Sequence, residues 1–416
     1  METYIQINKI LEDLKEADQL KLGTLSYFPT DSDEEDDEEA EEDLPRLYHQ
    51  VCQDAPFLIE IDLVPFTVAT VKGKPIEEQD LLPQAVPSAY GDLKEGTTKV
   101  NLDVRKAHEI KDVVITPKML QSVDGILPCV SEQLFGDRKV RAVFDKVNLY
   151  SKGGFFQEHV DTPKVGRVGT LIVQLPGTYE GGLAFGSQHF GASAKLKLLA
   201  FYGNCPHQIT PITNGTRISL TFHLLSTDSY QTEKVQVPYT LYGYEHSARY
   251  VTPGVQKVRK LDTSKAREIR IQRLIRQLQE NVKEQKLGLI LPNSYSNHEL
   301  NVNSLKNPEN YLYYTSKLQG QLIPIVIVQE TEIYQDSQDS NYQVFRCSPE
   351  DIDALVAKKP VVPTGDPMQF IGCDTKGIVL KADYGPYIEF TGNESQIGWK
   401  NNLYFTTALI LSEDCL

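Results

Sequence analysis

The fold is indicated most clearly by residues 200–224, which read AFYGNCPHQITPITNGTRISLTFHL. In this stretch two runs rich in apolar and β-branched residues, 207–212 and 216–225, flank the dipeptide Asn214-Gly215. Asn-Gly between two such runs is the strongest short-range signal for a β-hairpin. We therefore expect these two runs to form neighbouring strands that pair with each other.

The same pattern continues upstream of that stretch. Residues 140–150, 169–175 and 195–202 are further strand-like runs, separated by turn-forming residues such as Gly, Pro and Asn. A helix is predicted to begin before them, because Thr116 is a good N-cap and Pro117 fits the first helical position. Many short strands with tight turns and few helices favour a sandwich or jelly roll. The sequence thus predicts a mainly β fold, α+β overall.

Composition divides the chain into three regions. Residues 1–45 combine a predicted amphipathic N-terminal helix with an acidic run, which we expect to be a disordered linker. Residues 46–235 carry the predicted strands, and residues 140–225 carry the informative motifs. Residues 236–416 are predicted to form an α+β region of unknown role.

The most strongly periodic segment of that last region is residues 265–286, which are predicted to form a helix. Its apolar face comprises Ile271, Leu274, Ile275, Leu278 and Val282. Short strands are expected at residues 321–328 and 402–411.

The negative charge is concentrated in one tract. The formal net charge is −15, and residues 31–43 alone contain eleven acidic residues, so the remainder carries only −4. We interpret the tract as a solvated linker, and a docking tail for a basic partner is the alternative. Nucleic-acid binding by the whole chain is not favoured. A row of arginines on the predicted helix is interpreted as a solvated face, with nucleic-acid contact or pairing with the tract as the alternative; it comprises Arg267, Arg270, Arg273 and Arg276.

Cysteine usage and hydropathy bear on the compartment. The six cysteines lie far apart with no C-x-x-C pair, so neither a disulfide scaffold nor a zinc ribbon is expected. The N-terminus lacks the apolar core of a signal peptide, and no apolar run is long enough for a membrane span. We therefore expect a cytoplasmic or nuclear protein.

Residues 150–164, which read YSKGGFFQEHVDTPK, carry the first candidate chemistry. His159 and Asp161 are two residues apart, and on a strand they would share one face. A lone His-x-Asp triplet is a weak signal, but His207 begins a later strand and supplies a second imidazole. Two histidines and one carboxylate form the facial triad of non-haem iron oxygenases, which leaves positions open for a 2-oxo acid and O2.

Arg217 and Ser219 follow His207 in the later stretch. If the 2-oxo acid is 2-oxoglutarate, its far carboxylate needs a cation, and the planar fork of arginine can bond both carboxylate oxygens. In the predicted hairpin Arg217 would face Ile212, roughly 16 Å along the strand from His207. Two inward side chains and a five-carbon ligand can span such a distance.

Together these stretches resemble the prolyl 4-hydroxylase-like 2-oxoglutarate/Fe(II)-dependent dioxygenases. The resemblance extends in order over residues 140–225 and includes YSKGGFFQEHVDTP, GTLIVQLP, YEGG, AFYGNCPH and NGTRISLTFHL. It implies a double-stranded β-helix (jelly roll) catalytic core with supporting helices.

Residue by residue, the resemblance also implies a site. The implied Fe(II) ligands are His159, Asp161 and His207. The implied cosubstrate-binding residues are Arg217 and Ser219 for the distal carboxylate of 2-oxoglutarate, Tyr150 lining the same pocket, and Gln174. O2 is the second cosubstrate, and ascorbate is the implied reductant. Relatives that halogenate carry a small residue in place of the carboxylate ligand, so Asp161 implies hydroxylation, or demethylation through hydroxylation.

The function expected from the sequence is hydroxylation of a C–H bond with release of succinate and CO2. A protein or peptide substrate is favoured, with a prolyl residue as the leading target, partly because Gly153-Gly154 and Gly181-Gly182 would keep loops near the site slim and mobile. The alternative is a catalytically idle jelly-roll scaffold that acts through its acidic tract and C-terminal region. Repair of alkylated nucleic acid is disfavoured, because residues 140–225 have no marked excess of Lys and Arg.

Overall fold

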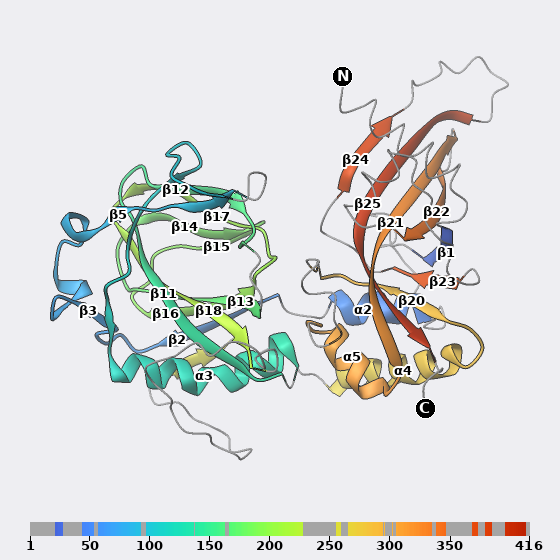
Figure 1. Ribbon diagram of the computed structural model, residues 1–416, viewed down its shortest axis with the longest axis horizontal. Helices are drawn as coiled ribbons and strands as arrows, with labels where there is room; N and C mark the ends of the chain where they lie inside the picture. The colour runs from blue at the N-terminus through green and yellow to red at the C-terminus, as the bar shows by residue number, and fades with distance from the viewer. Residues whose placement is uncertain are drawn as a thin grey trace. The chain divides into compact units, whose positions relative to one another are not determined.

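The computed structural model describes residues 21–27, 44–53, 57–92, 97–136, 138–162, 166–227, 255–258, 265–293, 295, 302, 305–334, 338–346, 368–372, 379–384 and 396–412. They form two compact units (Figure 1), a central unit within Pro56–Leu261 and a terminal unit from Met1–Ala55 and Asp262–Leu416. Both units are built mostly of β-strands with few helices, so the expected mainly β class is confirmed. No helix in these described ranges has the length and apolarity needed to cross a membrane.

The larger sheet of the central unit has eight antiparallel strands. In order across the sheet they are β19 (Val255–Val258), β2 (Leu58–Leu63), β16 (Leu196–Tyr202), β13 (Arg167–Gln174), β18 (Arg217–Ser226), β11 (Val140–Tyr150), β9 (His108–Ile110) and β5 (Val86–Pro87). The strands predicted from residues 140–202 are therefore all present, with ends shifted by at most two residues.

A second sheet of five strands lies over the first one in Figure 1. In order it contains β15 (Gln188–Phe190), β14 (Glu180–Phe185), β17 (His207–Asn214), β12 (Phe155–His159) and β8 (Arg105–Lys106). The smaller elements of the unit are β3 (Ala69–Val71), β4 (Lys74–Pro75), β6 (Tyr90–Asp92), β7 (Thr97–Lys99), β10 (Val114–Ile115) and two 3-10 turns, η2 (Ile76–Glu78) and η3 (Leu82–Gln84).

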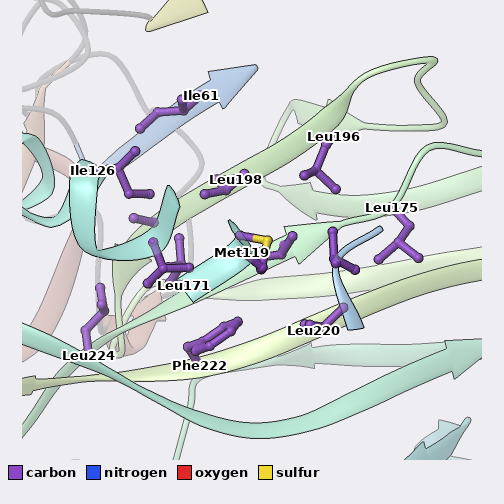
Figure 2. Packing of buried hydrophobic residues seen from close by; sticks show 14 of the residues in the cluster. Ile61, Met119, Ile126, Leu171, Leu175, Leu196, Leu198, Leu220, Phe222 and Leu224 are labelled. Atoms are coloured by element: carbon purple, nitrogen blue, oxygen red, sulfur yellow. The ribbon is translucent and has the colours of Figure 1, made fainter. Parts of the chain in front are cut away.

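Helix α3 (Pro117–Phe135) covers the other face of the eight-stranded sheet. It begins as predicted, since the Thr116 hydroxyl accepts a hydrogen bond from the Met119 N–H at 3.3 Å. The apolar core beneath this helix is drawn in Figure 2 and includes Leu171, Leu198 and Phe222. Because alternate residues of a strand point to opposite faces, the intervening positions face the five-stranded sheet.

The space between the two sheets holds a separate core, rich in aromatic side chains. The eight-stranded sheet contributes Tyr150, Ile172, Leu199 and Phe201, and the five-stranded sheet contributes Phe156, Leu183, Phe185, Phe190, Ile209 and Ile212. Any polar side chain on these inner faces is therefore held in a mostly apolar interior.

The predicted hairpin around Asn214-Gly215 is wrong. Strand β17 pairs with β12 and β14, whereas β18 pairs with β11 and β13, so the dipeptide carries the chain from one sheet to the other. Arg217 consequently pairs with Tyr150 and not with Ile212. Asn214 is the last residue of β17, and Gly215 alone has a positive φ, at the point where the chain crosses between the sheets.

Gly215 is required at this crossover by its backbone. Its φ is +72°, and a Cβ there would lie 2.3 Å from the carbonyl oxygen of Thr178. Gly73 offers a matched control, because its φ is +78° but a Cβ would meet nothing within 4 Å.

We expect Gly215→Ala to lower the free energy of unfolding by about 3 kcal/mol, through left-handed strain plus backbone overlap. Gly73→Ala should cost only about 1 kcal/mol, because strain alone applies. Chemical denaturation of the full chain measures both values. Equal losses for the two variants would contradict the requirement for close approach at Gly215.

The glycine pairs near the motif are also placed by close contacts. A Cβ at Gly181 would lie 2.4 Å from the Pro211 carbonyl oxygen, and one at Gly182 would lie 2.4 Å from that of Phe190. A Cβ at Gly154 would lie 2.7 Å from the Ser151 carbonyl oxygen. These glycines therefore allow tight packing, and they give no support to an open, slim mouth.

The terminal unit is built on a seven-stranded sheet. In order it contains β20 (Leu287–Ile290), β23 (Met368–Ile371), β1 (Lys21–Tyr27), β22 (Gln338–Arg346), β21 (Gln319–Tyr334), β25 (Gln396–Ser412) and β24 (Val379–Tyr384). Its helices are α2 (Leu44–Gln53), α4 (Lys265–Val282) and α5 (Glu309–Ser316). The apolar face predicted for α4 is confirmed, with four of its five residues buried and Ile271 partly buried against them.

The borders of the units differ from the regions defined by composition. Helix α2 packs on α4, and the Tyr48 hydroxyl donates to the Ile290 carbonyl at 2.9 Å, so the start of the 46–235 region belongs to the terminal unit. Strand β19, from the 236–416 region, pairs with β2 of the central unit. The predicted N-terminal helix and the acidic tract at 31–43 lie outside the described residues.

Candidate functional site

Two strands of the five-stranded sheet bring two histidines together. His159 at the end of β12 pairs in register with His207 at the start of β17, and their ring centroids are 4.3 Å apart. Asp161 lies just beyond β12, where its backbone N–H donates to the Gly203 carbonyl at 3.0 Å. One ligand atom from each of the three residues lies within 4.8 Å of the other two. The three predicted ligands therefore converge on one point.

Both imidazoles are held by their Nδ1 atoms. The Nδ1 of His159 lies 2.8 Å from the Gln157 carbonyl oxygen, and that of His207 lies 2.9 Å from the Cys205 carbonyl oxygen. A carbonyl oxygen can only accept, so Nδ1 carries a proton in both rings, and in the neutral form of each ring the lone pair then lies on Nε2. This is the tautomer and orientation that metal-ligating histidines adopt.

Aromatic rings surround these imidazoles. Phe156 stacks on His159 with 3.6 Å between centroids, while Phe201 and Phe185 lie 4.9 and 5.7 Å from the His207 ring. Burial lowers the pKa of His159 to about 3, and the neighbouring His207 adds to this effect. His159 is therefore neutral near pH 7, as a metal ligand must be.

Asp161 is held by two residues of β13. The Nη2 of Arg167 lies 2.7 Å from Oδ2 of Asp161, and the Thr170 hydroxyl donates to the same oxygen. Burial raises the pKa of Asp161, but the charge of Arg167, both histidines and the Thr170 hydrogen bond outweigh burial and leave the pKa below its ordinary value. The carboxylate is thus ionised, as a metal ligand must be.

Arg217, on β18, is a buried cation without a counter-ion among the described residues. It is only 1% exposed, and its Nη1 donates to the Ser219 hydroxyl at 3.0 Å. Its Nε and Nη2 are buried and make no hydrogen bond to the described chain. The guanidinium lies 5.8 Å from the Tyr150 ring centroid. A buried, unpaired charge is costly, so this arrangement fits an anion that is bound from outside the chain.

Gln174 and Tyr179 complete the surroundings of Arg217. Gln174 is fully buried and pairs across the sheet with Ser219. Its Nε2 donates to the Gly191 carbonyl at 2.8 Å, and its Oε1 has no partner among the described residues. Burial raises the pKa of Tyr179, against the opposing effect of the nearby Arg217 charge. Tyr179 belongs to the YEGG motif, but no role for it was predicted.

The three-ligand cluster and Arg217 border the same interior. Thr170, which holds Asp161, pairs with His223 of β18, and Arg217 lies six residues from His223 on the same face of that strand. Six residues of strand span about 20 Å between backbones. This distance along β18 replaces the distance along β17 that was expected from the hairpin. The long Arg217 side chain and a five-carbon diacid can together span much of it.

The remaining histidines near the motif take no part in the cluster. His223 lies 3.6 Å from Asp145, and the exposed His189 lies 3.3 Å from the Thr210 hydroxyl. Within the described residues, the cluster of His159, Asp161 and His207 is the one group with metal-ligand geometry.

The donor set fits Fe(II). Two imidazole nitrogens and one carboxylate oxygen on one side of a site form the facial arrangement used by non-haem iron oxygenases. The unpaired guanidinium of Arg217 fits the distal carboxylate of a 2-oxo diacid.

Besides Tyr179, sequence reasoning missed three polar residues that touch this site. Arg167 and Thr170 follow the motif closely, and their contact with Asp161 could have been suspected because a buried carboxylate needs donors. Arg105 lies 54 residues before His159, and no local pattern marks it.

No family model matches the sequence, and the comparison with curated proteins finds no match. Among solved structures, one similar chain is a prolyl hydroxylase from Trichoplax adhaerens in complex with a hypoxia inducible factor peptide fragment, at 20% identity and TM-score 0.27, covering 36% of this chain and 74% of that one. A Pseudomonas putida prolyl-4-hydroxylase has 19% identity and TM-score 0.25, covering 33% of this chain and 77% of that one. The viral collagen prolyl hydroxylase of Paramecium Bursaria Chlorella virus-1 has 19% identity and TM-score 0.27, covering 42% of this chain and 99% of that one. Because these TM-scores are low, the functional assignment has to come from this chain's own residues.

Proposed function

We propose that the chain is an Fe(II)- and 2-oxoglutarate-dependent dioxygenase whose catalytic core is a double-stranded β-helix within the central unit. The observation that carries this proposal is the joint presence of a His-Asp-His cluster and an unpaired buried arginine, both bordering the interior between two facing sheets. A scaffold with an idle site has no reason to bury a cation without a counter-ion.

In this proposal His159, Asp161 and His207 hold the metal. When bound, Fe(II) with 2-oxoglutarate supplies the oxygen chemistry, in which O2 is consumed, 2-oxoglutarate becomes succinate and CO2, and a substrate C–H becomes C–OH. Arg167 and Thr170 keep Asp161 ionised and both bind its Oδ2 atom. Phe185 and Phe201 border His207 and exclude water from that side.

The cosubstrate would be oriented by Arg217. Its free Nε and Nη2 donors would bond the distal carboxylate, while Ser219 holds Nη1 and keeps the fork in place. Tyr150 lies against the guanidinium and Gln174 pairs across the sheet with Ser219, so both are proposed to border the cosubstrate. Ascorbate is proposed only as a reductant that maintains Fe(II).

A protein or peptide is the proposed substrate, with a prolyl residue as the leading target. Val160, between two proposed ligands, is 37% exposed. The segment before β8 exposes Leu102 and Val100 and is tied to β12, because the Gln157 N–H donates to the Val104 carbonyl at 3.0 Å. An exposed apolar side chain between two ligands, with further exposed apolar side chains on a segment tied to the same strand, suits an apolar residue presented by an extended chain.

Mass spectrometry of proteins and metabolites tests this substrate class. Cells that lack the gene would be supplied with the wild-type chain or with the His159→Ala variant. We expect prolyl-containing peptides to gain the mass of one oxygen atom only with the wild type. If no peptide gains oxygen while a hydroxylated small molecule appears only with the wild type, the peptide assignment is wrong.

A further inference from the structure

Arg105 is a second buried arginine of the central unit, and it lies on the short strand β8. It is 6% exposed. Its Nη1 donates to the Ala89 carbonyl at 2.7 Å, and its Nη2 donates to the Asn148 side-chain oxygen at 2.7 Å. No acidic side chain pairs with it in the part of the chain that the structure describes. Its contacts therefore go to dipoles and rings, and not to a counter-ion.

The same guanidinium contacts both halves of the proposed site. Its Nη2 also donates to the Tyr150 hydroxyl at 3.4 Å, and Tyr150 is the ring that lies against Arg217. Its Cζ lies 4.6 Å from the Phe156 ring centroid, and Phe156 stacks on His159. One side chain thus links the cosubstrate end of the site to the metal end.

The contact with Tyr150 has a chemical consequence. A guanidinium has donors and no acceptor, so the Tyr150 oxygen accepts from Arg105 and the Tyr150 proton must point elsewhere. A neighbouring cation also makes that proton a better donor. In a mostly apolar interior, an anion beside Tyr150 is the acceptor that this arrangement prepares for.

We propose that Arg105 is a positioning residue that presents the Tyr150 hydroxyl as a hydrogen-bond donor to bound 2-oxoglutarate. It also holds the Phe156 ring in place against His159. The proposal rests on the proposed function and adds a residue that lies outside the motif. Asn148 and Ala89 fix the guanidinium, and the guanidinium in turn fixes Tyr150. A purely structural tie would stabilise the fold without acting through the Tyr150 hydroxyl.

Anaerobic titration of the Fe(II)-loaded full chain with 2-oxoglutarate separates these two roles, with the visible charge-transfer band as readout. The variants are Arg105→Met, Tyr150→Phe and their combination, and Lys106→Met is the matched control. Lys106 is an exposed cation next to Arg105 on β8. We expect Arg105→Met to weaken 2-oxoglutarate about tenfold, the lower end of what supporting residues of metal sites contribute. In the Tyr150→Phe background the same change should have little effect, because the hydroxyl it acts through is gone.

The outcomes are distinct. If the wild type itself shows no band, the proposed function fails, whatever Arg105 does. If the wild type shows the band but Arg105→Met binds 2-oxoglutarate like the wild type, the positioning role is overturned. It is also overturned if Arg105→Met weakens 2-oxoglutarate equally with Tyr150 and with Tyr150→Phe. Should Arg105→Met fail to fold by circular dichroism, Arg105→Lys is compared in the two backgrounds instead. If Arg105→Lys weakens 2-oxoglutarate binding only when Tyr150 is present, the positioning role is supported. If the affinity falls equally with Tyr150 and with Tyr150→Phe, or does not fall at all, the role is overturned. Lys106→Met should match the wild type throughout.

Discussion

Replacing His159, Asp161 or His207 singly with alanine is expected to abolish Fe(II) retention and succinate formation. The three side chains converge on one point from two strands and the segment that follows β12, and two ligands do not make a facial site. Loss of a residue that merely supports a metal ligand costs about 10–100-fold in affinity, so loss of a ligand itself should exceed about 100-fold. Anaerobic Fe(II) binding and assay of succinate after aeration measure the effect.

His189→Ala is the matched control for these three variants. His189 belongs to the same five-stranded sheet, but it is exposed and lies outside the cluster, and its Nε2 is 3.3 Å from the Thr210 hydroxyl. We expect it to retain wild-type iron binding and turnover. If any two of the ligand variants retained full iron-dependent turnover, the ligand assignment would be wrong.

Arg217→Ala should leave Fe(II) binding nearly unchanged and greatly weaken 2-oxoglutarate. Truncating one partner of a buried charge pair costs roughly 2–5 kcal/mol, which corresponds to about thirty-fold and upward in affinity. Arg217→Lys should fall between the wild type and the alanine variant, because the charge remains while the planar fork is lost. Titration of the charge-transfer band gives the affinities.

A second ligand supplies the control for Arg217. Pyruvate has the 2-oxo acid group of 2-oxoglutarate but no distal carboxylate. The wild type should prefer 2-oxoglutarate strongly over pyruvate, and Arg217→Ala should lose most of that preference without binding pyruvate less well. An unchanged preference in the variant would remove Arg217 from its proposed role, and equal weakening of both ligands would point to a damaged fold.

The parts of the site that could be predicted from the sequence are those set by short spacing and strand pattern. His159 and Asp161 are two residues apart, and His207 opens a strand whose apolar pattern is clear. Their convergence was expected on the face of a strand, although Asp161 lies past the end of β12 and is placed there by a backbone hydrogen bond to Gly203.

The predictions that were wrong, and the residues that were missed, depend on contacts between residues distant in sequence. Asn-Gly can occur both where a chain folds back on itself and where it passes to a facing sheet. At Gly215 the chain passes to the facing sheet and comes close to the Thr178 carbonyl. Local reasoning therefore gave Arg217 the wrong partner, Ile212. In the structure β18 pairs with β11, and Tyr150 lies opposite Arg217. Arg105 reaches Tyr150 only because β8 and β11 come together in the folded unit.

The central claim is that one site binds Fe(II) through His159, Asp161 and His207 and chelates 2-oxoglutarate beside Arg217. Its most direct test is anaerobic titration of the purified full chain with Fe(II) and then 2-oxoglutarate, followed by visible absorption. We predict a charge-transfer band that saturates at one equivalent of each ligand and is absent when pyruvate replaces 2-oxoglutarate at equal concentration. A chain that retains Fe(II) at these residues but shows no band with 2-oxoglutarate, or one that retains no Fe(II), would contradict the account.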